Sequence, residues 1–86
     1  MITRQTVVKH LADYLNSRTT LAALVDWAEN AIMKGGVEEA HAKEIMQALG
    51  RIGAADVKEF GLLWEDCENI TEQLGFVLKV DVEKAA

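Results

Sequence analysis

The chain lacks proline altogether and has a single cysteine, few aromatic residues and no long apolar run. Because Cys67 cannot form an intramolecular disulfide, we expect a reducing compartment, the cytoplasm. No apolar stretch approaches the roughly 20 residues that a membrane span needs, and the N-terminal residues do not form a secretory signal, so we expect no membrane association. Without proline, the ends of helices must be marked by glycine, capping residues and changes of period.

Basic residues are also scarce, with 9 Lys and Arg against 14 Asp and Glu, which gives a net charge of −5. This balance argues against nucleic acid or an anionic membrane as the main partner. A chain of 86 residues that is 50% hydrophobic and 27% charged suits one globular domain, so we expect a single domain over residues 1–86.

Apolar residues recur at helical spacing in four segments, which predicts a mainly helical domain. The first helix starts after the N-cap Thr3, and the second starts after Thr19 or Thr20 and ends at Gly35-Gly36. The third covers about residues 37–52 and the fourth about residues 63–74. The expected buried faces are Val7, Val8, Leu11, Tyr14 and Leu15; Leu21, Leu24, Val25, Ala28 and Ile32; Ile45, Ala48, Leu49 and Ile52; and Leu63, Cys67, Ile70 and Leu74.

After Gly75 the period of the sequence changes to two, which is typical of a strand over residues 76–83. The fold class expected is therefore mainly α with a minor β element, four helices followed by a short C-terminal strand. The strand needs a partner for its backbone groups: residues 57–60, the same strand of a second copy in a homodimer, or another protein. Val77, Lys79 and Asp81, on its outer face, are candidate partner-binding residues.

The negative charge is concentrated in residues 56–72, which hold six acids and only Lys58 as a base. On a helical projection Glu65, Glu68 and Glu72 share one ridge, opposite the apolar stripe of the fourth helix. One interpretation is a recognition surface for a basic protein partner. The other is an ordinary solvated face, since most exposed charge runs serve only that purpose.

The residues that could bind a metal or act as nucleophiles give little sign of catalysis. His41 lies three residues from both Glu38 and Glu44, a spacing compatible with a metal site. Di-iron helical bundles, however, need the Glu-x-x-His motif twice, together with further glutamates, and this sequence has it once. Cys67 falls in an apolar stripe, where a thiol behaves as a small hydrophobe. Trp27 and Trp64 are expected to cover seams between helices. We therefore expect no enzyme, no catalytic residue and no cofactor.

Several segments share a distinctive pattern: Asp-Tyr-Leu-Asn at 13–16, Leu-Val-Asp-Trp-Ala-Glu at 24–29, Ala-Asp-Val at 55–57, Phe-Gly at 60–61 and Trp-Glu-Asp-Cys at 64–67. These segments resemble a group of short uncharacterised bacterial proteins, and the spacing of Tyr-Leu and Trp-Ala is loosely similar to small helical immunity proteins that neutralise bacterial toxins. The resemblance implies a bacterial cytoplasmic protein and no catalytic residue. At Leu63 the chain departs from the pattern, which has a threonine able to cap the fourth helix.

The leading functional hypothesis is a non-catalytic, acidic protein–protein interaction module, immunity- or antitoxin-like, that uses the glutamate ridge and the strand edge. The first alternative is a metal-binding protein using His41 with Glu38 or Glu44. The second is a homodimeric structural protein joined through its C-terminal strand.

Overall fold

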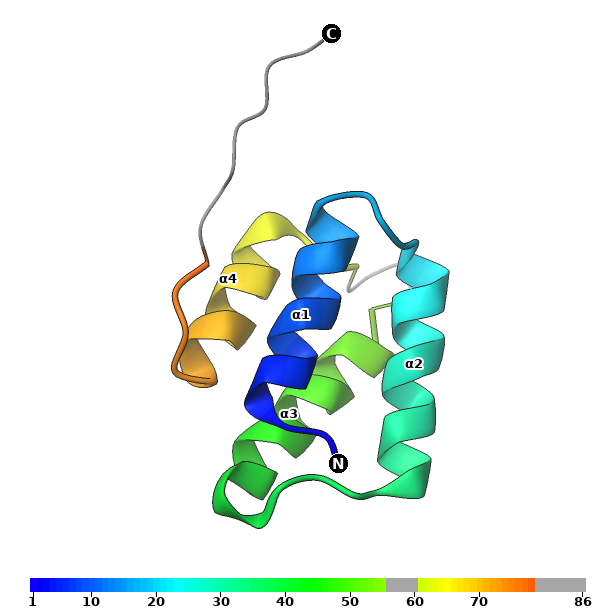
Figure 1. The fold of residues 1–86 in the computed structure, drawn as a ribbon. Helices are drawn as coiled ribbons and strands as arrows, with labels where there is room; N and C mark the ends of the chain where they lie inside the picture. The colour runs from blue at the N-terminus through cyan, green and yellow to red at the C-terminus, as the bar shows by residue number, and fades with distance from the viewer. Residues whose placement is uncertain (56–60, 79–86) are drawn as a thin grey trace, which may run out of the picture.

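The computed structural model describes residues 1–55 and 61–78, while residues 56–60 and 79–86 lie outside its described part. The described residues form four α-helices and one short 3-10 turn (Figure 1). A mainly helical fold is thus confirmed. The helices are α1 (Arg4–Leu15), α2 (Leu21–Lys34), α3 (Ala42–Gly53) and α4 (Trp64–Gln73), with the 3-10 turn η1 (Glu39–His41) directly before α3.

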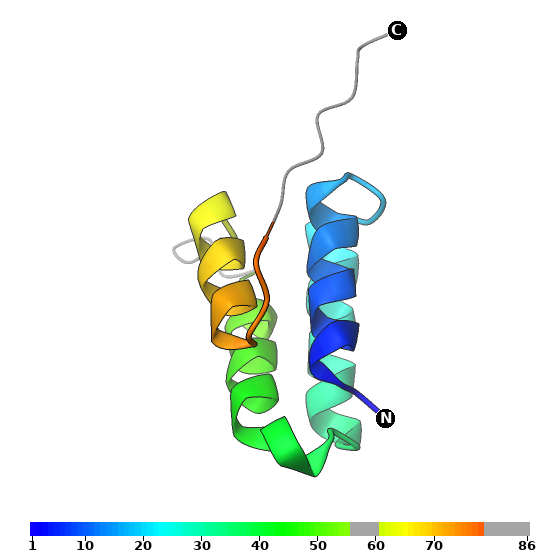
Figure 2. The same cartoon turned by 60° about the vertical axis from the view of Figure 1, so that its left-hand side comes forward.

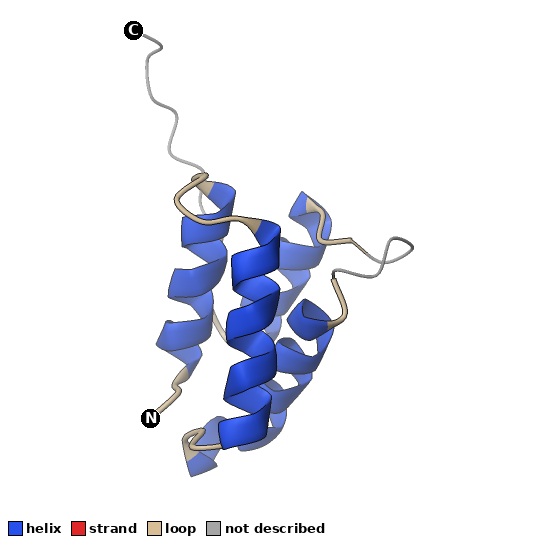
Figure 3. Cartoon of the chain, turned by 90° about the vertical axis from the view of Figure 1, so that its right-hand side faces the viewer, coloured by secondary structure: helices blue, strands red, loops and turns tan. Residues whose placement is uncertain are grey.

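The helices form two layers, one of α1 and α2 and the other of α3 and α4 (Figures 2 and 3). The most extensive helix–helix contact is between α2 and α3, and α1 contacts each of the other three helices. The core lies between the layers and draws buried apolar residues from all four helices. No helix in the described part of the chain is long and apolar enough to cross a membrane.

The helix ends follow the capping signals of the sequence. The Thr3 hydroxyl accepts a hydrogen bond from the backbone N–H of Thr6, and Thr20 caps α2 in the same way through Ala23. Gly35 ends α2 with a φ of 68°, a conformation that costs glycine little. The predicted starts of α1 and α2 are therefore confirmed.

The predicted buried faces are confirmed for α3 and in part for the other helices, where Val8, Tyr14, Leu15 and Leu21 are half-buried against the core. All four expected residues of α3 are buried, from Ile45 to Ile52. In α2, however, Ala31 is buried and Ile32 is exposed. The reason is the close approach of α2 to α3, where a small side chain fits the interface and a larger one must lie at its edge.

The predicted start of the third helix is wrong. Val37 is extended and forms a parallel β-bridge with Ile2, and Glu38 also has an extended backbone, with φ −65° and ψ 136°. Ile2 donates to the carbonyl of Gly36 at 2.8 Å, and its own carbonyl accepts from the N–H of Glu38 at 2.9 Å. These backbone bonds hold residues 37–38 out of the helix, which sequence periodicity could not indicate.

The predicted C-terminal strand lies mostly outside the described residues. Residues 76–78 belong to no helix or strand, and residues 79–83 and the proposed pairing segment 57–60 are not described. Phe76 and Leu78 pack against the core, whereas Val77 is 78% exposed. The inward–outward alternation expected at the beginning of this segment is therefore present.

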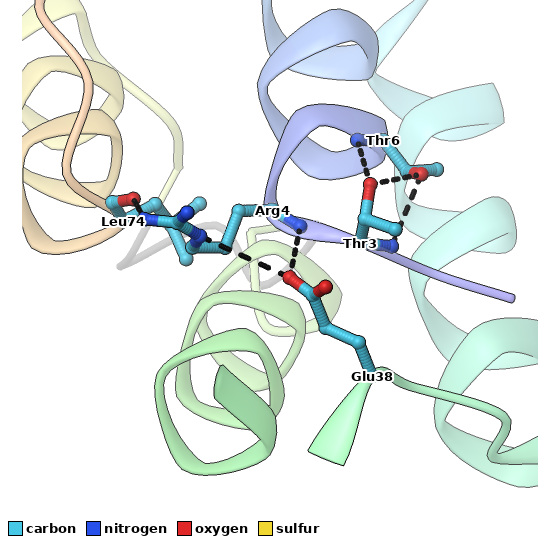
Figure 4. A network of polar contacts seen from close by, with 5 residues as sticks. All are labelled: Thr3, Arg4, Thr6, Glu38 and Leu74. Atoms are coloured by element: carbon cyan, nitrogen blue, oxygen red, sulfur yellow. Dashed lines mark hydrogen bonds and ion pairs between the residues drawn. The ribbon is translucent and has the colours of Figure 1, made fainter. Parts of the chain in front are cut away.

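Arg4 links the start of α1 to two distant parts of the chain (Figure 4). Its Nη1 donates to the carbonyl of Leu74 at 3.1 Å, at the end of α4. Its Nε lies 3.8 Å from Oε1 of Glu38, and its backbone N–H donates to the same oxygen at 3.3 Å. The guanidinium also lies over the ring of Phe76, 5.5 Å from its centroid, so one side chain joins α1, the segment before η1 and the end of α4.

Gly75 is required beside this contact. Its φ is +86°, and an added Cβ would lie 3.0 Å from Nη1 of Arg4. Any larger residue would therefore be strained by its backbone and would press on the guanidinium.

Replacing Arg4 by Met should lower the free energy of unfolding by about 2 kcal/mol, because the carbonyl of Leu74 loses a charged donor and the carboxylate of Glu38 loses its ion-pair partner. Chemical denaturation measures this change. The matched control is Arg18→Met, since the Arg18 side chain is 72% exposed and, among the described residues, forms an ion pair only with Asp13 at 3.6 Å; this variant should lose about 0.5 kcal/mol or less. Equal losses in the two variants would show that Arg4 has no special role.

Candidate functional site

The candidate site is the outer surface of α4, which lies at one edge of the molecule (Figures 1 and 2). The inner side of the helix is anchored by Cys67, Ile70 and Leu74, all buried as predicted. Thr71 is fully buried beside them, and its hydroxyl donates to the carbonyl of Cys67 at 2.7 Å, so its polar group is satisfied within the helix.

The predicted acidic ridge faces away from this anchor. Glu65 and Glu72 are exposed and Glu68 is half-buried. The three glutamates are separated by three and four residues, so they follow one another along one side of the helix. The helical projection from the sequence therefore placed them correctly relative to the core.

Asp66, the fourth acid of α4, has a structural role instead. Its Oδ2 accepts a hydrogen bond from the backbone N–H of Leu63 at 2.9 Å and lies 3.1 Å from Nη2 of Arg51. The hydrogen bond from Leu63 is the largest influence that lowers the pKa of Asp66, and the charge of Arg51 adds to it. Arg51 also donates to the carbonyl of Gly61 at 3.0 Å, so it fixes the chain that leads into α4.

The three ridge glutamates differ from Asp66 in having no ion-pair partner among the described residues. The ion pairs found there are Arg4 with Glu38, Arg18 with Asp13, and Arg51 with Asp66. Among the described residues, Arg51 is the cation that forms an ion pair with α4, and it pairs with Asp66. No described cation compensates the ridge, and uncompensated charge of this kind suits electrostatic recognition.

Two exposed apolar side chains lie at the beginning of this ridge. Leu63 is 68% exposed and Trp64 is 40% exposed. The prediction that Leu63 belongs to the buried face is wrong, because Leu63 is the N-cap with an extended backbone and the helical period begins only after it. Leu62 is buried in its place.

The two tryptophans have different surroundings. Trp27 is half-buried and stacks on His10, with ring centroids 3.7 Å apart, and so covers the seam between α1 and α2 as predicted. Nδ1 of His10 donates to the carbonyl of Thr6 at 2.8 Å, which fixes the imidazole. Trp64 does not share such a position, since it is exposed next to the ridge.

A polar groove runs along the other flank of α4, between it and α3. Its volume is about 320 Å³, and it is lined by Gln47, Ala48, Arg51, Asp66, Asn69, Ile70 and Gln73. Sequence reasoning missed the groove because it depends on which faces of α3 and α4 meet. The i, i+4 spacing of Gln47 with Arg51 and of Asn69 with Gln73 was the available signal.

The predicted metal ligands are not arranged as one helical motif. Glu38 precedes the helix and is held by Arg4, while His41 is the last residue of η1 and Glu44 lies in the first turn of α3. Within residues 1–55 and 61–78 no three His, Cys, Asp or Glu side chains gather as metal ligands. Cys67 is buried, and this burial raises the pKa of its thiol to about 11, so the thiolate is disfavoured at neutral pH.

The candidate residues of the strand edge are described only in part. Val77 is exposed, in keeping with a contact role, while Lys79 and Asp81 lie outside the described residues. The structure brings the three glutamates together but does not place them relative to those two residues.

Comparisons with protein-family models, with curated proteins and with solved structures find no match to this chain. Any functional assignment must therefore rest on the geometry described above.

The start of α4 offers a direct test of how the ridge is supported. Leu63 has the backbone of an N-cap, with φ −87° and ψ 168°, but no side-chain acceptor. Leu63→Thr should therefore raise the free energy of unfolding by about 1 kcal/mol, because a hydroxyl can accept the N–H of Asp66 and little apolar burial is lost.

The matched control is Leu63→Val, which has the shape of threonine without the hydroxyl. Chemical denaturation of the two variants isolates the capping bond. If Leu63→Val raises the free energy of unfolding as much as Leu63→Thr, the missing capping hydrogen bond does not limit the stability of α4.

Proposed function

We propose that this protein is a non-catalytic binding module that presents the ridge formed by Glu65, Glu68 and Glu72 to a basic surface of a partner protein. An immunity- or antitoxin-like role, in which an acidic protein masks a basic one, belongs to the same proposal. So does a cytoplasmic location, since the only cysteine is the free thiol of Cys67.

The observation that carries the proposal is the contrast between Asp66 and the three ridge glutamates. Asp66 is neutralised by Arg51 at 3.1 Å, whereas the glutamates have no cation within ion-pair distance in the part of the chain that is described. A purely solvated face would show the same exposure. The proposal is favoured because these charges accumulate on one helix, whereas residues 1–55 hold equal numbers of acids and bases.

The apolar residues at the start of the ridge support a protein partner over a small cation. Trp64 and Leu63 expose apolar surface directly beside Glu65 and Glu68. Partially buried tryptophans that become covered on binding are frequent anchors of protein interfaces. Charges around such an anchor mainly raise the rate of association and select the partner.

The spacing of the ridge describes the partner surface it fits. The glutamates follow the i, i+3, i+7 pattern of one helix face, so they span about 10 Å along the axis. Lysine or arginine residues spaced over a similar length would meet all three. An apolar residue near one end of that basic set would contact Trp64.

Reversing the charge of the ridge should abolish partner capture. In the triple variant Glu65→Lys, Glu68→Lys and Glu72→Lys, a basic protein that wild type retains from a lysate of the source organism at low salt should no longer bind. The same protein should be lost from wild type at high salt, because exposed charges are screened over about 10 Å or less. Quantitative mass spectrometry of the captured proteins measures both effects.

The control is a second triple reversal, Asp26→Lys, Glu29→Lys and Glu39→Lys, at exposed acids outside α4. It changes the net charge of the protein by the same amount, so it separates the effect of the ridge from the effect of overall charge. Retention of the partner by the control and loss by the ridge variant supports the proposal. Equal binding by all three proteins contradicts it, and recovery of the bait alone favours the homodimer alternative.

A further inference from the structure

A second concave surface lies at the end of α2. The helices α2 and α4 lie on opposite sides of the molecule (Figure 1). The pocket at the end of α2 has a volume of about 310 Å³, at the lower limit of small-molecule pockets, which hold about 300–1,000 Å³. Its lining is mostly apolar. The residues that line it are Met1, Ile2, Trp27, Asn30, Ala31, Lys34, Gly35 and Gly36.

The walls of this pocket are fixed by contacts already described. The backbone bonds of Ile2 to Gly36 and Glu38 lay the N-terminal segment against the end of α2. Trp27 forms a second wall, and its ring is held by the stack on His10, with only 10° between the ring planes. Ala31 is buried and supplies a small side chain between them. The pocket is therefore largely preformed.

Its charge differs from that of the rest of the molecule. Lys34 is the one lining residue with a charged side chain, although acids outnumber bases by 14 to 9 in the chain. In the described part of the protein Lys34 forms no ion pair, and the amide of Asn30 forms no hydrogen bond. The C-terminal end of α2 carries a partial negative charge that repels an anion. The full positive charge of Lys34, in the last turn of the same helix, is larger than this partial charge and opposes it.

We propose that this pocket binds a small organic carboxylate with an apolar body. The body would contact Trp27, Ala31 and Ile2, and the carboxylate would face the ammonium of Lys34 and the amide of Asn30. A free small molecule is favoured over a protein segment because the cavity is small and has a single charged side chain rather than an extended charged surface. This site is separate from the acidic ridge, and its function does not depend on the proposal for α4.

The test is a titration of the full ¹⁵N-labelled protein with three probes of one chain length: octanoate, 1-octanol and octylammonium. Octanoate should bind most tightly and should shift the indole N–H signal of Trp27 and the amide signals of Ala31, Gly35 and Gly36. Octylammonium should bind most weakly, because Lys34 repels it. Equal affinity for the three probes, or shifts confined to another region, would overturn the proposal.

A charge-removal variant identifies the cation. Lys34→Gln should weaken octanoate binding about three- to fivefold and leave octanol binding unchanged, as expected for one partly exposed ion pair. Lys43→Gln removes an exposed charge from α3 and should change neither. If both variants weaken octanoate binding equally, the effect comes from net charge and the assignment to Lys34 is wrong.

Discussion

The position of α4 depends on two arginines that belong to other helices. Arg51, from α3, contacts both the carbonyl of Gly61 and the carboxylate of Asp66 at the start of α4. Arg4, from α1, donates to the carbonyl of Leu74 at its end. Hydrogen bonds with a charged partner are stronger than neutral ones, and a guanidinium can serve several acceptors at once. With three apolar anchors between these points, α4 is tied to the core along its whole length.

This arrangement explains why the acidic ridge is available. Arg51 pairs with Asp66 and Arg4 with Glu38, so these two arginines hold the helix and leave Glu65, Glu68 and Glu72 uncompensated within the described residues. The paired acid and the three unpaired acids thus lie on different sides of one short helix. A rigid helix also limits the entropy lost on binding, which favours a preformed interface.

Much of the helical fold could be predicted from the sequence, because helical periodicity and capping are local. Thr3, Thr20 and the Ile45–Ile52 face of α3 follow such rules. One error occurs where a distant residue decides, since Ile2 keeps Val37 extended. The other is local, since Leu63 is the N-cap of α4 and so lies outside the helical period. The ridge was predictable from spacing within one helix. The roles of Arg4 and Arg51 and both cavities were not, since each requires contacts between helices.

Amide hydrogen exchange of α4 tests most directly whether arginines fix the surface that carries the ridge. The account predicts that the amides of α4 in wild type are protected from exchange to nearly the same degree as those of α2 and α3. Arg51→Met should lower the protection of α4 alone, because it removes a contact that opposes local opening of this helix without unfolding the whole protein. Exchange in α4 that is fast in wild type, or unchanged by Arg51→Met, would contradict it. The helix would then owe its position to apolar packing alone or would not be held in place.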